Sequence, residues 1–200
     1  MSDRDPAGAL RQVAAELTRL RVPFAVVGGL GVSVRAEVRF TRDVDVAVDV
    51  SDDAGVESLV RELRTARYEI IALVEHEDAK RIATVRLRSP SGITVDLLTA
   101  SSGIEPEIVA QAGLVTIEDI GEVPVAVAED LLATKVLSMD ERRLQDRIDA
   151  IRLVEVNPNL DGERVRGDLR LIEQRGYSRS QDLAAKLRDV IESARSTRER

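Results

Sequence analysis

The chain has 200 residues, a formal net charge of −7, 44% hydrophobic residues and 32% charged residues. This length fits one ordinary domain, or a catalytic domain with a helical extension, and the composition allows a buried core. The absence of cysteine excludes disulfides, thiolate metal sites and a cysteine nucleophile, and the single histidine, His76, excludes histidine-rich metal sites. Aromatic residues make up only 2% of the chain, which argues against a base-stacking surface for single-stranded nucleic acid.

The first 127 residues predict a sheet with helices packed on it. The pattern of apolar and turn residues indicates helices over 6–20, 30–38, 53–67 and within 101–113, and strands over 24–27, 43–50, 68–74, 82–87, 93–98, 114–120 and 123–127. The strands over 82–87 and 93–98 are expected to form an antiparallel hairpin around the turn at 89–92. His76 falls in a charged turn over 75–80, so we expect it to be exposed.

The rest of the chain predicts only helices, over 128–139, 141–156, 162–174 and 180–194. The expected fold is therefore α+β: a mixed sheet flanked by helices in a core domain over residues 1–127, followed by a helical domain over residues 128–200.

No apolar run is long enough to span a membrane, and the N-terminal residues lack the pattern of a signal peptide. We therefore expect a cytoplasmic protein with no membrane partner. The acidic charge balance gives no overall attraction to polyanions, although a basic cleft built from Arg35, Arg39, Arg42 and Arg81 could reverse this locally.

Three acidic residues stand out in the predicted sheet. Side chains alternate along a strand, so Asp43 and Asp45 point to the same face, and a third acid, Asp96, lies inside a later apolar strand. Carboxylates on one face repel each other unless a positive charge lies between them, and Mg²⁺ prefers such oxygen ligands. If the two strands are neighbours, all three carboxylates meet at one edge. Asp49 has the same parity but lies at the far end of the strand, so we leave it out of the site.

The turn at Gly28-Gly29 lies between the first predicted strand and a short helix. Glycine lets the backbone turn without a side-chain clash, and free N–H groups at the start of a helix are suited to bind phosphate. The sequence therefore predicts a phosphate cradle facing the acids.

Together these motifs resemble the signature of the polymerase-beta-like nucleotidyltransferase superfamily: Gly28-Gly29, then Asp43-Val44-Asp45. The lead-in over residues 39–42, Arg-Phe-Thr-Arg, is more specifically similar to the AbiEii/AbiGii toxin-type nucleotidyltransferases. Residues 131–135, Leu-Leu-Ala-Thr-Lys, resemble the family helix that presents a lysine to the nucleotide, and residues 142–149 resemble its R-x-x-(K/Q)-D-x-x-D helix. The resemblance covers residues 22–153.

The resemblance implies a nucleotidyltransferase that moves a nucleoside monophosphate from a nucleoside triphosphate (NTP) to a hydroxyl acceptor. Asp43, Asp45 and Asp96 would hold Mg²⁺, with two ions expected, and Asp96 would also be placed to act as base on the acceptor. The acceptor would be tRNA, a protein or a small molecule. The protein could be the toxin of a toxin–antitoxin pair, with an antitoxin protein as partner.

The resemblance also implies residues that contact the nucleotide. Gly28 and Gly29 would cradle the triphosphate, Lys135 would neutralise its charge, and Arg39 would bind phosphate. Asp146 would be an additional catalytic acid from the helical half.

The chain departs from the family pattern at two positions. Many members have Gly-Ser where this chain has Gly28-Gly29, so a serine contact to phosphate is missing, and Ser33, one helical turn later, is the candidate substitute. The lysine that precedes the acid in the family is Gln145 here. Neither change removes a predicted metal ligand.

Other interpretations of these residues remain open. Lys135 could extend to solvent, and Asp146 and Asp149 could simply pair with arginines three or four residues away on their helix. The strand, Gly28-Gly29, helix, strand arrangement ending in Asp49 is also faintly similar to a dinucleotide-binding unit, although its third glycine is missing. A non-catalytic nucleotide-binding or regulatory protein of the same fold is a further alternative.

Overall fold

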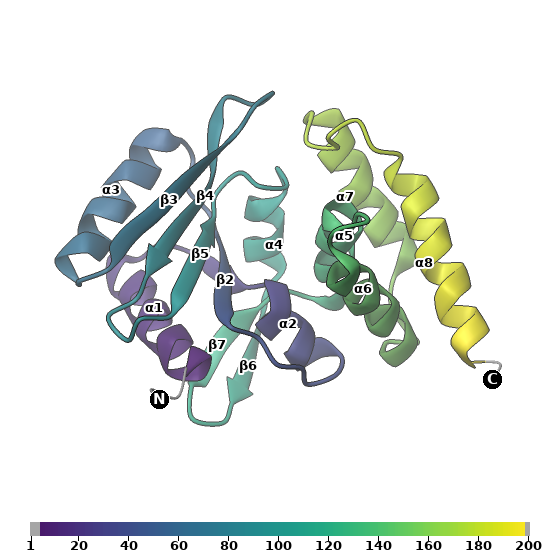
Figure 1. Cartoon of the computed structure of the whole chain (residues 1–200), viewed down its shortest axis with the longest axis horizontal. Coiled ribbons are helices and arrows are strands. Elements are labelled where there is room, and N and C mark those ends of the chain that lie inside the picture. The colour runs from purple at the N-terminus through teal and green to yellow at the C-terminus, as the bar shows by residue number, and fades with distance from the viewer. Residues whose placement is uncertain (1–4, 199–200) are drawn as a thin grey trace.

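A computed structural model describes the backbone of residues 5–198 and the side chains up to residue 196. Figure 1 shows a sheet with its helices on one side of the molecule and a helical bundle on the other. The elements of the first part are α1 (Pro6–Leu20), β1 (Phe24–Val26), α2 (Gly28–Arg35), β2 (Asp43–Val48), α3 (Asp53–Thr65), β3 (Glu69–His76), β4 (Arg81–Arg88), β5 (Thr94–Leu98), α4 (Glu105–Gln111), β6 (Gly113–Ile117) and β7 (Gly121–Val125). The bundle consists of α5 (Ala128–Ser138), α6 (Leu144–Val156), α7 (Gly162–Gln174) and α8 (Leu183–Arg198).

The strands form one mixed sheet of seven strands in the order β3-β4-β5-β2-β1-β7-β6. β2 pairs with β5 and β1 pairs with β7 in parallel, and the remaining pairs are antiparallel. This topology confirms the expected mixed sheet flanked by helices. The alternative of a dinucleotide-binding unit is wrong, because that unit needs parallel neighbours on either side of its helix, whereas β1 and β2 run antiparallel.

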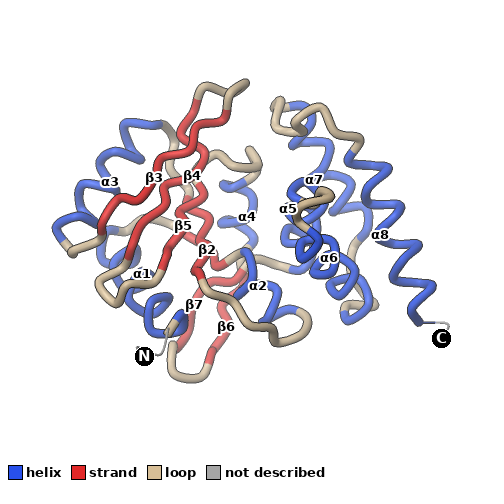
Figure 2. Tube along the Cα trace, in the orientation of Figure 1, coloured by secondary structure: helices blue, strands red, loops and turns tan. Residues whose placement is uncertain are grey.

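The two faces of the sheet have different partners. Val44, Val46 and Val48 of β2 belong to a core cluster with residues of α1 and α3, whereas Ala47 belongs to a second cluster with α4 and the bundle. Figure 2 shows α1 and α3 on one side of the strands, and α2 and α4 between the strands and the bundle. The alternation along β2 therefore turns Asp43 and Asp45, which share the parity of Ala47, toward the bundle.

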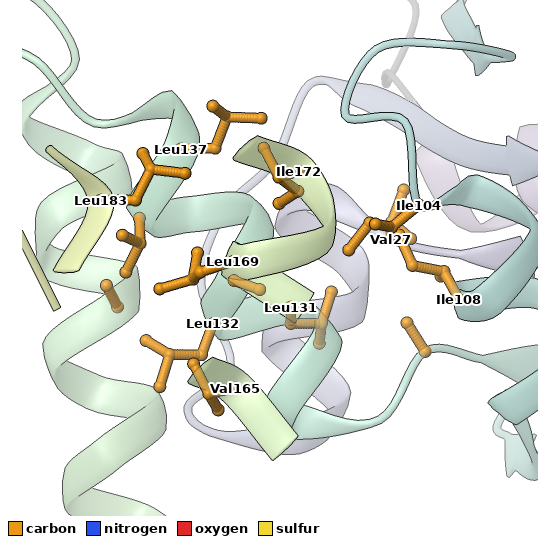
Figure 3. Packing of buried hydrophobic residues seen from close by; sticks show 14 of the residues in the cluster. Val27, Ile104, Ile108, Leu131, Leu132, Leu137, Val165, Leu169, Ile172 and Leu183 are labelled. Atoms are coloured by element: carbon orange, nitrogen blue, oxygen red, sulfur yellow. The ribbon is translucent and has the colours of Figure 1, made fainter. Parts of the chain in front are cut away.

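The bundle packs directly on the sheet through the second cluster. Figure 3 shows this packing, with Val27 and Ile108 at one end, Leu183 at the other and Leu131 of α5 between them. At Gly31 of α2, an added Cβ atom would lie 3.1 Å from Leu131 Cδ2, so the helices approach closely. One hydrophobic cluster thus contains residues from both sides of the expected domain boundary between residues 127 and 128. The division of the chain into two domains at this boundary stays a proposal.

Several element boundaries differ from the sequence predictions. α2 begins at Gly28, two residues earlier than expected, and α8 extends to Arg198 instead of ending at 194. α6 begins at Leu144 and not at 141, because the Asp140 side chain accepts hydrogen bonds from the N–H groups of Arg142 and Arg143 and so holds a turn before the helix. Within the described residues no helix is both long enough and apolar enough to cross a membrane.

The prediction that His76 is exposed is wrong. β3 continues through His76, where a turn was expected, and the side chain is buried. Its ring packs against Tyr177, with ring centroids 4.4 Å apart, and its Nδ1 accepts a hydrogen bond from the N–H of Ala79. The contact with Tyr177 comes from a segment distant in the sequence, so the local charge pattern did not reveal it.

A buried acidic pair joins two helices of the bundle. Asp130 of α5 and Asp168 of α7 are both buried, and Arg164 donates a hydrogen bond to Asp130 Oδ1 at 2.8 Å. Burial, followed by the nearby charge of Asp130, raises the pKa of Asp168 from 3.8 to about 6. Because the pair has one arginine for two carboxyl groups, it is better accommodated with one proton bound.

The contact between the bundle and the sheet predicts the effect of Leu131→Ala. This change removes a fully buried side chain from the second cluster, so the free energy of unfolding should fall by about 2–5 kcal/mol in denaturant titration. Leu144→Ala is the control, because Leu144 is 64% exposed and its removal should change little. Equal losses for the two variants would contradict the packing described here.

The acidic pair predicts a pH-dependent effect of Asp168→Asn. A raised carboxyl pKa contributes stability that is complete below pH 3.8 and is lost as the pH rises through about 6. The asparagine cannot titrate, so between pH 4 and pH 7.5 the wild type should lose about 1–2 kcal/mol of unfolding free energy relative to the variant. Glu173→Gln, an exposed acid on the same helix, is the control. A pH-independent difference between wild type and Asp168→Asn would contradict the raised pKa.

Candidate active site

The structure brings the three predicted acids into one cleft between the sheet and the bundle. β2 and β5 are adjacent and parallel, and their register places Asp45 opposite Asp96 and Asp43 opposite Thr94. Directly opposed residues on neighbouring strands have side chains on the same face. Asp43 precedes Asp45 by two positions and therefore lies on that face as well.

Asp45 is the most perturbed acid of the cleft. Its pKa is raised from 3.8 to about 6, first by burial and then by the charges of Asp43 and Asp96, against the opposing effects of Lys135 and a hydrogen bond from the Gly29 N–H. Burial and the two neighbouring acids thus disfavour the ionised form of Asp45 more than Lys135 and the Gly29 N–H favour it. A divalent cation would favour the ionised form.

Gly28 and Gly29 allow the start of α2 to lie against these acids. Gly28 has a φ of +57°, and a Cβ atom there would lie only 1.9 Å from Asp45 Oδ2. At Gly29 a Cβ atom would lie 2.7 Å from an Arg39 guanidinium nitrogen and 2.9 Å from Thr41 Oγ1. Thr41 in turn donates a hydrogen bond to Asp43 Oδ1 at 3.1 Å. Both glycines are therefore explained by close approach, and their N–H groups lie beside the acids.

Asp96 is held by an arginine that the sequence analysis did not identify. Arg86, directly across the β4–β5 hairpin, donates to both carboxylate oxygens at 2.9 and 2.7 Å. The Asp96 side chain is buried, whereas 49% of the Arg86 side chain is exposed. The hydrogen bonds to Asp96 raise the pKa of Arg86, so the guanidinium stays charged. The third acid is thus oriented, but both of its oxygens are occupied.

Lys135 lies at the centre of a buried ion network between α5 and α6. Its Nζ is 2.6 Å from Asp146 Oδ1 and 2.8 Å from Asp149 Oδ2, and Arg39 also contacts Asp149 Oδ2 at 2.9 Å. Burial alone would raise the pKa of Asp149, but hydrogen bonds from Lys135 and Gln145 and the charge of Arg39 lower it. The interpretation that Lys135 extends to solvent is therefore wrong. The pairing of Asp146 with Arg143, the residue just before α6, does occur at 3.1 Å, but Asp146 also contacts Lys135.

The cleft has two lobes that share Asp45, Asp96, Lys135 and Asp146. The outer lobe, of about 480 Å³, extends along β2 toward Asp43 and the start of α2; it is lined in addition by Gly29, Arg39, Thr41, Arg142 and Gln145. The inner lobe, of about 260 Å³, extends the other way along the strands; among the residues that line it in addition are Gly28, Ala47, Leu98, Ser101, Thr134 and Arg179. Arg86 and Arg143 border both lobes.

The donor set fits a divalent cation incompletely in this conformation. Asp43 and Asp45 both line the outer lobe with carboxylate oxygens, and burial together with the charges of Asp43 and Asp96 raises the pKa of Asp45. Within residues 5–198, however, no three acidic or histidine side chains converge closely enough to form a complete metal-binding group. The physical reason is Arg86, which occupies both oxygens of Asp96. Asp43 and Asp45 could hold a cation as they stand, and Asp96 would join them if Arg86 moved.

Most of the predicted site residues line this cleft, but four predicted arginine or serine positions do not. One of them, Arg42, lies with its guanidinium carbon 6.0 Å from the centroid of the Phe40 ring. The cleft includes Gly28, Gly29, Arg39, Asp43, Asp45, Asp96, Lys135 and Asp146. The Ser33 hydroxyl bonds to the carbonyl groups of Gly29 and Arg39, so it fastens the loop before β2, and its contact with phosphate stays a prediction. Arg35 donates to Val125 and Ala126, and Arg81 pairs with Asp53, so neither forms part of a basic cleft.

Comparison with solved structures identifies the fold. The fold matches a nucleotidyltransferase-like protein from Paracoccidioides brasiliensis with a TM-score of 0.51 and 19% identity, over 94% of each chain. It also matches the lincosamide antibiotic adenylyltransferase LnuA, with a TM-score of 0.51 and 15% identity, over 74% of this chain and 96% of that one. A third match is ANT(2″)-Ia in complex with adenylyl-2″-tobramycin, with a TM-score of 0.50 and 11% identity, over 84% of this chain and 97% of that one. The chain thus has the nucleotidyltransferase fold.

The family is shown by the sequence. Residues 12–199 match the family model described as nucleotidyl transferase AbiEii toxin, type IV toxin–antitoxin system. The chain therefore belongs to the AbiEii nucleotidyltransferase family, which confirms the resemblance found in its motifs. No curated protein matches the chain significantly.

The contact between Arg86 and Asp96 predicts the effect of Arg86→Gln on metal binding. Loss of the arginine frees the Asp96 oxygens and removes a nearby positive charge, so Mn²⁺, as a spectroscopic probe, should bind about fivefold more tightly in electron paramagnetic resonance titrations. Arg88→Gln is the matched control, because Arg88 is an exposed arginine of the same strand and parity. Unchanged or weaker Mn²⁺ binding by Arg86→Gln would show that Arg86 does not compete with the metal.

Proposed function

We propose that this protein is a Mg²⁺-dependent nucleotidyltransferase that moves a nucleoside monophosphate from an NTP to a hydroxyl acceptor. The observation that carries the proposal is the register of β2 and β5, which places Asp45 opposite Asp96 in a cleft that also contains the start of α2 and Lys135. Membership in the AbiEii family supports the same chemistry.

The triphosphate fits the outer lobe. Gly29 lines this lobe, Gly28 lines the inner lobe next to it, and both present backbone N–H groups at the start of α2, where the helix dipole favours anions. Arg39, at the same end, offers a guanidinium suited to phosphate, and Lys135 supplies a compact positive charge from α5. Asp149 is a positioning residue in this scheme, because it holds both cations through one carboxylate oxygen.

The transfer step breaks one phosphorus–oxygen bond and forms another. The acceptor hydroxyl oxygen attacks the α-phosphorus, pyrophosphate leaves, and the hydroxyl proton passes to Asp96 once its oxygens are free of Arg86. Asp43 and Asp45, together with Asp96, would hold up to two Mg²⁺ ions, which would neutralise charge on the phosphates and orient the attacking and leaving oxygens. The contribution of the protein is mainly positioning and charge neutralisation. Asp146 would act through Lys135, which it contacts.

The acceptor remains one of three classes: tRNA, a protein or a small molecule. Membership in a family described by a type IV toxin–antitoxin system supports the toxin role, with an antitoxin protein as partner. Two solved structures with the same fold are an antibiotic adenylyltransferase bound to lincomycin and an enzyme bound to adenylylated tobramycin, which keeps a small-molecule acceptor in view. Because NTPs are the proposed substrates, we place the protein in the cytoplasm.

A non-catalytic nucleotide-binding role is the second candidate. The observation in its favour is the bidentate contact of Arg86 with Asp96, which occupies the acid proposed as base. The two roles differ in one result: a binding protein takes up NTP and Mg²⁺ without releasing pyrophosphate.

The test is transfer of label from each of the four α-³²P-labelled NTPs, with Mg²⁺, to total tRNA, to cell protein and to a set of small hydroxyl compounds. Wild-type protein should transfer label in at least one combination. Asp43→Asn and Asp45→Asn should each lower the rate by about 10³-fold or more, because each removes a proposed Mg²⁺ ligand and leaves negative charge on the phosphates less neutralised. Asp49→Asn is the matched control, since Asp49 follows β2 with the same parity and is exposed. Transfer that survives Asp45→Asn would overturn the assignment of the acids.

A further inference from the structure

The inner lobe is the part of the cleft whose occupant the proposed function leaves open. Along β2 the outer lobe is bounded by Asp43 and Asp45, and the inner lobe by Asp45 and Ala47, so the two lobes lie on opposite sides of Asp45. On β5 they meet at Asp96, and only the inner lobe continues to Leu98. Asp45 and Asp96 therefore stand at the junction of the two lobes.

In-line displacement decides which reactant enters which lobe. The attacking oxygen and the leaving oxygen lie on opposite sides of the reacting phosphorus. If the leaving pyrophosphate lies in the outer lobe, beside Gly29 and Arg39, then the hydroxyl oxygen must approach from the inner lobe. This step rests on the proposed function, because it assumes that an NTP occupies the outer lobe.

Positive charge gathers at the rim of the inner lobe. Arg143 comes from the segment between α5 and α6, and Arg179 from the segment between α7 and α8, yet both line this lobe. Partial burial and then the charge of Arg143 lower the pKa of Arg179, which shows that the two guanidinium groups are close enough to repel each other. Within the described residues Arg179 forms no ion pair, and its one hydrogen bond goes to the carbonyl of Ser101.

The backbone that carries Arg179 is unusual. Arg179 and Ser180 have φ values of 55° and 59°, and two consecutive non-glycine residues in the left-handed region are energetically unfavourable. Arg143 pairs with Asp146 Oδ2 at 3.1 Å, but 57% of its side chain stays exposed. The adjacent Glu105 forms no ion pair with either arginine. Its carboxylate accepts hydrogen bonds from the N–H groups of Ser101, Ser102 and Gly103 and so is already used within the protein.

We propose that the inner lobe binds the acceptor and that Arg143 and Arg179 bind a phosphate group that this acceptor carries. The ligand class is a hydroxyl compound with a phosphate ester, whose hydroxyl lies at Asp96 and whose phosphate lies at the arginine pair. Arginine is suited to this role because its planar guanidinium donates two parallel hydrogen bonds to phosphate. The terminal nucleotide of an RNA and a small sugar phosphate share this chemistry.

Calorimetric titration of the full chain with ribose 5-phosphate, and with ribose as the unphosphorylated comparison, tests the proposal. Wild-type protein should bind ribose 5-phosphate, and Arg179→Gln and Arg143→Gln should each weaken this binding by about tenfold or more, because each removes a charge-assisted contact. Arg142→Gln is the matched control: Arg142 belongs to the segment that carries Arg143 but lines only the outer lobe, so the affinity should stay within about twofold.

The source of the phosphate is distinguished by a second ligand, a short single-stranded RNA with a free 3′ hydroxyl. Either ligand supports the proposal if its binding depends on Arg179. Tighter binding of the RNA assigns the site to a nucleic acid terminus, and equal binding assigns it to a small phosphorylated molecule. The proposal is overturned if Arg179→Gln leaves the affinity for both ligands unchanged, if ribose binds as well as its phosphate, or if only Arg142→Gln weakens binding.

Failure of the proposed function is recognised separately. Binding of Mg²⁺ and NTP to the wild type, measured in the same way, should depend on Asp43 and not on Arg179, which lies outside the outer lobe. If no NTP binds, the nucleotidyltransferase proposal fails, whereas dependence of ribose 5-phosphate binding on Arg179 still decides whether the arginine pair is a phosphate site.

Discussion

Repulsion between carboxylates is the constraint on which the active site depends. β2 and β5 place three acids on one face of the sheet, and the bundle covers that face, so the acids are removed from much of the solvent that would screen them. The surrounding residues compensate in different ways. Arg86 pairs with Asp96, and the charge of Lys135 lowers the pKa of Asp45. Burial and the neighbouring acids outweigh Lys135, so the pKa of Asp45 is raised overall. A cation that enters the cleft would therefore reduce the repulsion among its carboxylates.

The bundle contributes to the site as much as the sheet does. Lys135 and the two acids that hold it come from α5 and α6, and Arg39, from the loop before β2, is tied to the same network through Asp149. A buried charge network of this kind is sensitive to the loss of any member, because each removal leaves another charge unpaired. The network therefore joins the loop that precedes the acids to the helices that face them.

The sequence predicted those parts of the site that follow from local pattern. The alternation of Asp43 and Asp45, the Gly28-Gly29 turn and the hairpin around 89–92 each depend on residues close together in the chain. Arg86 was missed, although the hairpin places it directly across from Asp96 once the register is known. The buried state of His76 was not predictable in the same way, since Tyr177 belongs to a distant segment. The contacts of Lys135 depend on how α5 packs against the next helix, α6, which the helical pattern alone does not give. Arg35 and Arg81 were wrongly predicted to lie in the cleft, because the sequence alone does not show which partners a long charged side chain will contact.

The hydrophobic cluster between the sheet and the bundle has a consequence for access to the active site. Val27 and Ala47 on one side, and Leu131 and Ile172 on the other, belong to the same packed core beneath the cleft. A hinge that opened the two halves would have to expose these side chains to water, which is costly. Core packing therefore opposes widening of the cleft by a hinge. For the proposed function, this means that selection among acceptors would depend on fit within the cleft and not on closure around the substrate.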